Sequence, residues 1–104
     1  MIVEIRTYTL KPGTRSTAAA AFDKLLPACQ ALGMKVAGPW LSTEDPNVLV
    51  WMRGFADVKA RTAMTGAFYN GSAWQNELSG IFMPILEKYD VVPVEMAETA
   101  VNWL

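Results

Sequence analysis

The stretch Asn47–Phe55 constrains the fold more than any other part of the sequence, because it is the most apolar run that also carries a charge and large aromatic side chains. Its residues alternate between two sets: Val48, Val50 and Met52, and Leu49, Trp51, Arg53 and Phe55. Such a period of two is typical of a β-strand. The stretch therefore predicts a strand at the centre of a sheet.

Three further segments have the character of strands. Ile2–Leu10 alternates with a period of two, whereas Met34–Ser42 and Asp90–Met96 are apolar segments that each contain a proline. Because proline cannot donate to a sheet ladder, Pro39 and Pro93 indicate that these two strands lie at the edges of the sheet.

Helical patterns fill the segments between the strands. Thr14–Leu32 carries an apolar stripe at three- and four-residue spacing, in which Pro27 should kink or break the helix and Gly33 should end it. Asp57 is a natural N-cap for a second amphipathic helix, which Gly71 should stop.

A further helical piece is expected before the last strand, because Ser72 and Gln75 have the spacing of a capping box and an apolar pattern runs on to Phe82. The resulting order is the ferredoxin-like βαββαβ plan of the α+β class, with one extra helical piece. We expect residues 1–104 to form one domain, against which the apolar tail Ala97–Leu104 docks.

Charge and composition exclude several classes of function. The net charge is −1 and the basic residues are scattered, so no clustered positive field exists to bind nucleic acid. No apolar run is long enough to span a membrane, and charges stand where a signal peptide needs its apolar stretch. We therefore expect a cytoplasmic protein without a membrane or nucleic-acid partner.

The absence of histidine removes the usual general base, zinc ligand and haem ligand together. We accordingly expect no metal and no cofactor, and we assign no catalytic residue. Ser42 has no histidine to activate it, and the single cysteine, Cys29, fits a packed core position. The hydrophobic content of 52% is high for a soluble domain, which indicates that apolar surface is buried in a homodimer.

Polar side chains coincide on two strands that should be neighbours. Glu4, Arg6 and Tyr8 share one face of the first strand, and Trp51 and Arg53 share one face of the third. One interpretation is a site for an anion or a carbonyl group, with the arginines and the tyrosine as donors. The alternative is a patch of ion pairs inside a dimer seam.

Aromatic side chains suggest a pocket between the sheet and the helices, lined by Trp40, Met64, Phe68, Tyr69 and Trp74, although such residues also commonly form core. The two patterns together give a set of candidate ligand-binding residues: Arg6, Tyr8, Trp40, Trp51, Arg53, Tyr69 and Trp74.

Motifs along nearly the whole chain resemble the NIPSNAP family. They are Ile5–Gly13, Gly38-Pro39-Trp40 with Ser42 and Glu44, Asn47–Phe55, Arg61, Phe68-Tyr69, and Ala73-Trp74-Gln75. The resemblance implies a ferredoxin-like domain that pairs with a second copy into a dimeric α+β barrel, and it implies no agreed activity. Trp51 stands where many members carry a histidine, so no role of that histidine transfers to this chain.

Two hypotheses of function follow. In the first, each subunit binds a small organic ligand or anion between sheet and helices, and at most acts as a cofactor-independent, monooxygenase-like enzyme. In the second, the protein is a non-catalytic homodimeric interaction module. This hypothesis is motivated by the lack of a side chain that could act as a general base near neutral pH.

Overall fold

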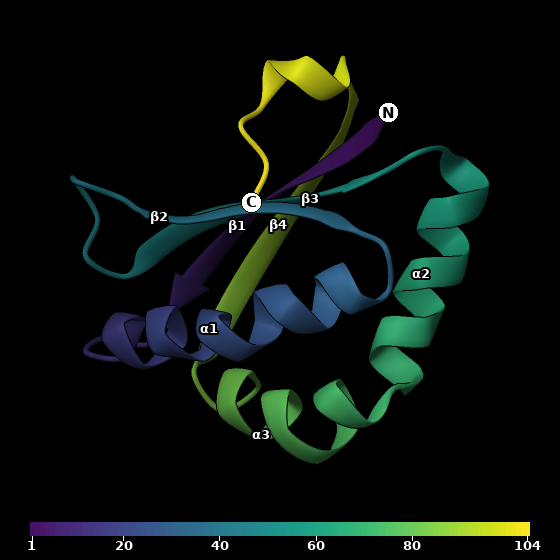
Figure 1. The fold of residues 1–104 in the computed structure, drawn as a ribbon. Coiled ribbons are helices and arrows are strands. Elements are labelled where there is room, and N and C mark those ends of the chain that lie inside the picture. Colours follow the sequence, from purple (N-terminus) through teal and green to yellow (C-terminus); the bar gives the residue numbers. More distant parts are fainter.

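The computed structural model describes residues 1–104 and consists of a four-stranded antiparallel sheet with helices on one face (Figure 1). The elements are β1 (Ile2–Leu10), α1 (Arg15–Ala31), β2 (Lys35–Leu41), β3 (Val48–Phe55), α2 (Val58–Asn70), a π-helical turn η1 (Trp74–Leu78), α3 (Ser79–Phe82), β4 (Leu86–Glu95) and a 3-10 turn η2 (Glu98–Ala100). This is the predicted ferredoxin-like order, with the extra helical piece before the last strand.

The strand order is β2-β3-β1-β4, so β1 and β3 are central and the two strands with internal prolines lie at the edges, as predicted. β1 and β3 pair in a register that sets Glu4 opposite Arg53 and Arg6 opposite Trp51. Partners in an antiparallel ladder project to the same side of the sheet. The register therefore brings these four side chains onto one face.

The two faces of the sheet have opposite surroundings. On the face that carries Glu4 and Arg6, side chains such as Leu10, Leu49 and Phe55 pack beneath the helices and form the core. The other face carries Ile5, Thr7 and Thr9 of β1, opposite Met52, Val50 and Val48 of β3. None of the helices α1, α2 and α3 covers this second surface, which we call the open face (Figure 1).

The first helix is not interrupted by its proline, so the expected break at Pro27 is wrong. Pro27 is exposed, whereas Phe22, Leu25 and Cys29 on either side of it are buried in the core. Packing along the buried stripe therefore holds one continuous helix despite the missing hydrogen bond. No helix of the structure combines the length and the apolar character needed to span a membrane.

The second helix is capped as predicted, because the Asp57 carboxylate accepts a hydrogen bond of 2.7 Å from the backbone N–H of Ala60. The capping box that we expected after it is wrong. Ser72 makes no such bond, and the Gln75 side chain instead donates to the carbonyl oxygen of Tyr69 at 2.6 Å. The segment is α-helical at Ser72 and Ala73 and becomes a π-helical turn from Trp74 to Leu78.

The last strand begins at Leu86 rather than at the predicted Asp90. Its first half pairs with the end of β1, where Tyr89 lies opposite Tyr8 and Lys88 opposite Thr9. Glu87, Lys88 and Asp90 are exposed charged residues in this half of the edge strand, so the period of two is lost and the strand signal in the sequence is weak.

The C-terminal tail returns over the open face, on the side of the sheet away from the helices (Figure 1). The Leu104 N–H donates to the carbonyl oxygen of Val36 at 3.0 Å, and the Trp103 indole donates to the carbonyl oxygen of Glu98 at 3.0 Å. A side chain added at Gly54 would meet the Trp103 ring at 3.2 Å. The tail thus docks on the sheet, as expected.

Removing residues 97–104 should lower the thermal midpoint by about 5 °C, because the loss of one partly buried aromatic contact costs about 1 kcal/mol in a domain of this size. Trp103→Ala should account for most of the decrease, and Asn102→Ala, which changes an exposed side chain, is the control. Differential scanning calorimetry measures the midpoints. An unchanged midpoint for the truncated chain would contradict the docking.

Candidate functional site

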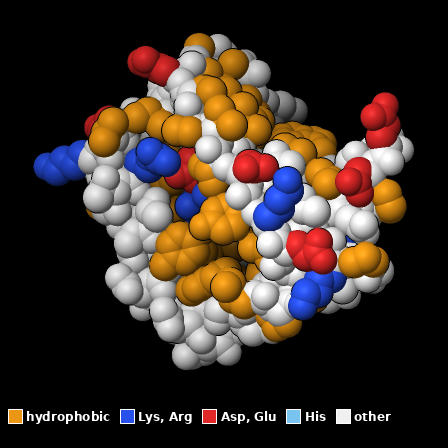
Figure 2. All heavy atoms as spheres, turned by 180° about the vertical axis from the view of Figure 1, so that it is seen from behind, with side chains coloured by type: hydrophobic (Ala, Val, Ile, Leu, Met, Phe, Trp, Pro, Cys, Tyr) orange, Lys and Arg blue, Asp and Glu red, His pale blue; other side chains and the backbone are white.

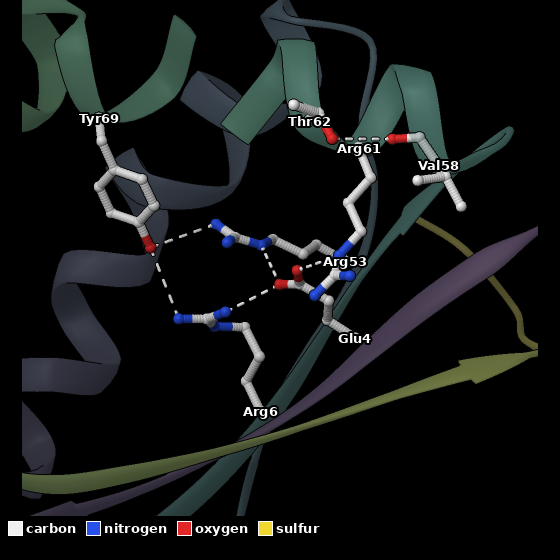
Figure 3. Close-up of polar contacts among 7 residues, drawn as sticks. All are labelled: Glu4, Arg6, Arg53, Val58, Arg61, Thr62 and Tyr69. Atoms are coloured by element: carbon white, nitrogen blue, oxygen red, sulfur yellow. Dashed lines mark hydrogen bonds and ion pairs between the residues drawn. The ribbon is translucent and has the colours of Figure 1, made fainter. Parts of the chain in front are cut away.

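A single carboxylate, that of Glu4, binds three arginines on the helix-covered side of the sheet (Figure 3). Its Oε1 accepts from Arg6 Nη1 at 2.8 Å and from Arg53 Nε at 2.6 Å. Its Oε2 accepts from Arg61 Nε at 2.8 Å. We call Glu4, Arg6, Arg53 and Arg61 the arginine cluster.

The Tyr69 hydroxyl closes this arrangement from the helical layer (Figure 3). It accepts hydrogen bonds from Arg6 Nη2 and from Arg53 Nη1, both at 3.5 Å. Guanidinium groups donate and cannot accept, so the hydroxyl hydrogen of Tyr69 has no acceptor within this ring of contacts. That hydrogen is available to a ligand oxygen.

The cluster holds more positive than negative charge in a place with little water. Glu4, Arg6 and Arg53 are only 3%, 6% and 2% exposed, and Arg61 is the one member that reaches solvent. Two buried guanidinium groups therefore share one buried carboxylate. A buried charge without a counter-charge is costly, so this excess favours the approach of an anion.

The pKa values follow from this geometry. Burial alone would raise the pKa of Glu4, but the charge of Arg53 and the hydrogen bonds from Arg61 and Arg53 outweigh it, so the pKa lies below its ordinary value. Burial would lower the pKa of Arg6, but Tyr8, Tyr69 and Glu4 together raise it above its ordinary value. Glu4 and Arg6 therefore both keep their charges at physiological pH.

Aromatic rings surround the two buried arginines. The Arg6 Cζ atom lies 5.6 Å from the centroid of the Trp51 ring, and the Arg53 Cζ atom lies 5.5 Å from that of the Tyr69 ring. Contacts of this kind offset part of the cost of a buried cation. Two N–H groups in this region still lack a hydrogen-bond partner, because the Arg6 Nε and Trp51 Nε1 atoms are buried without one.

A cavity of about 170 Å³ opens beside the cluster, between the sheet and the helical segments. It is lined by Arg6, Tyr8, Tyr69, Trp74, Met83, Leu86 and Tyr89. Figure 2 shows a hollow on this side of the molecule with hydrophobic walls and charged side chains at its margin. The cavity thus has one charged end and an otherwise aromatic and aliphatic lining.

The structure brings four of the seven candidate residues together in this cavity: Arg6, Tyr8, Tyr69 and Trp74. Trp51 and Arg53 lie behind them, where Trp51 is 1% exposed and contacts both arginines. Trp40 does not line the cavity, because it pairs with Val50 and is 47% exposed.

Glu4 forms ion pairs with both Arg6 and Arg53, as the alternative interpretation predicted. The prediction that these ion pairs lie in a dimer seam is wrong. They lie on the helix-covered face of the sheet inside one subunit, where Tyr69 of α2 covers them. The other two suggested pocket residues, Met64 and Phe68, pack in or against the core.

Four residues of the site were not predicted as such from the sequence: Arg61 of the arginine cluster, and Met83, Leu86 and Tyr89 of the cavity wall. Arg61 stands in the first half of an amphipathic helix, where an arginine is ordinarily a solvated charge. Tyr89 lies opposite Tyr8 in the part of β4 that precedes the predicted start at Asp90, where no period of two marks a strand.

Neither the cysteine nor the acidic residues form a second chemical centre. Cys29 is buried in the core, and burial raises the pKa of its thiol to about 11, so it stays protonated at neutral pH. Histidine, cysteine, aspartate and glutamate side chains nowhere form a group of three or more that could hold a metal ion.

The fold and the site together define a ferredoxin-like α+β protein with an arginine cluster beside an aromatic cavity. A model of the NIPSNAP family matches residues 3–87, which is most of the chain. The chain therefore belongs to the NIPSNAP family.

Solved structures with the same fold include other members of this family. An uncharacterised NIPSNAP domain protein from Burkholderia xenovorans has a TM-score of 0.79 at 24% identity, covering 94% of this chain and 96% of that one. A NIPSNAP family protein from Agrobacterium tumefaciens str. C58 has a TM-score of 0.77 at 18% identity, covering 93% of each chain.

An antibiotic biosynthesis monooxygenase is also similar, with a TM-score of 0.71 at 14% identity, covering 93% of this chain and 99% of that one. At such identities the likeness shows the fold alone. No curated protein matches the sequence.

Glu4→Gln should reduce the free energy of unfolding by about 3 kcal/mol at neutral pH, because it leaves buried arginines without their counter-charge. The folded-state pKa of Glu4 is lowered from 4.5, so its contribution is complete above that value and is lost as the pH falls through the lower folded-state pKa. Urea unfolding at neutral pH and at about pH 3 should therefore show a difference between variant and wild type that shrinks in acid.

The matched control for this change is Glu77→Gln, which removes an exposed ion pair with Lys24. Exposed pairs contribute little, so stability should hardly change. A Glu4→Gln protein as stable as the control at neutral pH would show that the arginine cluster does not depend on this carboxylate.

Proposed function

We propose that this protein binds a small organic anion in the cavity between the sheet and the helices, as one subunit of a homodimer. The proposal rests on Arg6, which is buried, charged and part of the cavity wall. Ligand sites are typically apolar hollows with a few polar groups that fix orientation, and this cavity has that composition.

The charge balance carries the argument. Glu4 neutralises the equivalent of one buried arginine, and a second buried guanidinium remains beside the cavity. An anion at this end would gain charge-assisted hydrogen bonds from Arg6 and a hydrogen bond from the Tyr69 hydroxyl. Because only one net buried positive charge is available, the expected affinity is modest, with a dissociation constant of about 0.1 to 1 mM.

Oxygenase-like chemistry is a weaker candidate for this site. The fold is shared with an antibiotic biosynthesis monooxygenase, but the cavity supplies no side chain suited to take a proton near neutral pH. The Glu4 carboxylate contacts the cavity wall through Arg6, but three arginines lower its pKa and occupy both of its oxygens. Binding requires no such base.

A non-catalytic interaction module is the second candidate, and the open face favours it. Trp40 and Val92, which are 47% and 54% exposed, belong to a surface that also presents Ile5, Val50 and Met52. A second copy facing this surface would bury it around a two-fold axis. Pairing and ligand binding use opposite faces of the sheet, so the two functions are compatible.

Arg6→Met should abolish the binding of organic anions and leave the fold intact, because Glu4 keeps Arg53 and Arg61 as partners. Benzoate, octanoate and 2-naphthoate are suitable probes of different sizes and shapes. Titration followed by tryptophan fluorescence reports on Trp74 in the cavity wall and on Trp51 behind Arg6, and calorimetry provides a second readout.

The matched control is Arg15→Met, because Arg15 binds backbone oxygens of the hairpin before β3, away from the cavity. This variant should bind the probes like the wild type. If none of the three anions binds the wild type in either assay, the small-molecule proposal fails and the interaction module remains.

Light scattering should give twice the monomer mass at micromolar concentration. Met52→Lys, which places a charge on the open face, should yield a monomer, because a buried unpaired charge opposes pairing. Val58→Lys changes an exposed residue of α2 and should leave the dimer intact. A wild-type monomer, or a dimer that survives Met52→Lys, would refute pairing through this face.

A further inference from the structure

We propose that the ligand is a flat, single-ring monoanion of the benzoate type, with its carboxylate at Arg6 and its ring between the aromatic walls. This inference rests on the proposed function and narrows it to one class of compound. Four features of the site carry it: volume, wall chemistry, the charge balance, and the surplus of donors at the polar end.

The volume sets the number of rings. A cavity of about 150 Å³ accommodates one benzene molecule, whereas sites for drug-sized ligands usually exceed about 300 Å³. The cavity here is about 170 Å³. It therefore holds one six-membered ring with a small substituent, and a fused second ring does not fit within this volume.

The walls favour an aromatic ring over an aliphatic one. The Tyr69 and Trp74 rings meet edge to face, with centroids 5.2 Å apart, and the Tyr8 and Tyr89 rings are also edge to face at 6.5 Å. A flat ring placed among them can continue this pattern of edge-to-face contacts. Besides Arg6 the wall consists of three tyrosines, Trp74, Met83 and Leu86, so aromatic and aliphatic surfaces dominate it.

The charge balance limits the ligand to one negative charge. Arg6 is the only charged residue of the cavity wall, and its Nη1 atom already binds Glu4 behind it. A second negative charge on the ligand would lie against apolar walls and would also be repelled by the Glu4 carboxylate.

The surplus of donors identifies the head group. The guanidinium of Arg6 has more N–H groups than Glu4 and Tyr69 accept, and the Tyr69 hydroxyl hydrogen has no acceptor in the cluster. A carboxylate only accepts hydrogen bonds, so it satisfies these donors without adding another. A carboxamide, by contrast, would bring N–H groups that a guanidinium cannot accept.

The far end of the cavity is apolar and open. Met83 and Tyr89 are 61% and 58% exposed, and Leu86 lies beside them in the wall. A ring held by its carboxylate would direct its opposite edge toward these side chains. Methionine sulfur packs well against aromatic edges, so Met83 can cover a ring that has entered.

The test compares four probes on the wild-type protein by calorimetry and tryptophan fluorescence: benzoate, benzamide, phthalate and 2-naphthoate. Benzoate should bind best. Benzamide, which lacks the charge, phthalate, which carries two charges, and 2-naphthoate, which carries two rings, should each bind at least about tenfold more weakly.

Enlarging the cavity should change the preference for size and leave the preference for charge unchanged. Trp74→Ala removes a wall and should bring 2-naphthoate to the affinity of benzoate or beyond, while benzamide stays weak. Leu86→Ala is a second, smaller change for the case in which Trp74→Ala does not fold. Val58→Ala, far from the cavity on the exposed side of α2, should keep the wild-type order.

This inference is overturned while the proposed function stands if 2-naphthoate or phthalate binds the wild type as tightly as benzoate. It is also overturned, with the proposed function intact, if octanoate binds in the anion titration described above and benzoate does not. Binding of benzamide as tight as that of benzoate would overturn the proposed function as well, because Arg6 would then not select for charge. If no anion binds, both fail.

Discussion

The contact between one carboxylate and three arginines is the constraint on which the rest of this structure depends. Arg6 and Arg53 sit on the two central strands and point into the layer between sheet and helices, where cations are stable only beside a counter-charge. Glu4 supplies that charge because the register of β1 and β3 sets it opposite Arg53. Arg61 extends the contact to α2, so the same carboxylate also ties a helix to the sheet.

The fold was largely predictable because its signals are local. Alternation in Ile2–Leu10 and Asn47–Phe55 identified the central strands, and the prolines of the other two strands identified the edges. Errors arose where tertiary packing overrides local preference. Pro27 does not break α1, since buried neighbours hold the helix, and Gln75 binds the Tyr69 carbonyl rather than capping a new helix. The resulting π-helical turn carries Trp74, and such turns frequently occur at functional sites.

The candidate site was predictable in composition but not in position. Alternation alone showed that Glu4 and Arg6 share a face, yet it could not tell which face the helices cover. A face with three polar residues normally meets solvent or a partner, whereas here it is the buried one. Arg61 could not be found in this way because its contact with Glu4 joins segments far apart in the sequence. Trp40 was placed in the pocket by residue type, and the ladder instead pairs it with Val50.

The mouth of the cavity is built differently from its polar end. Met83, Leu86 and Tyr89 come from one short stretch that runs from the end of α3 into an edge strand, whereas Arg6 is fixed in a central strand. Substitutions at the exposed Met83 and Tyr89 can alter the shape of the entrance without changing the buried arginine that binds the ligand. Proteins that share this architecture can therefore differ in the size and shape of the ligand that enters the cavity while they keep the same charged binding group. The edge of the sheet is where such divergence is least costly to stability.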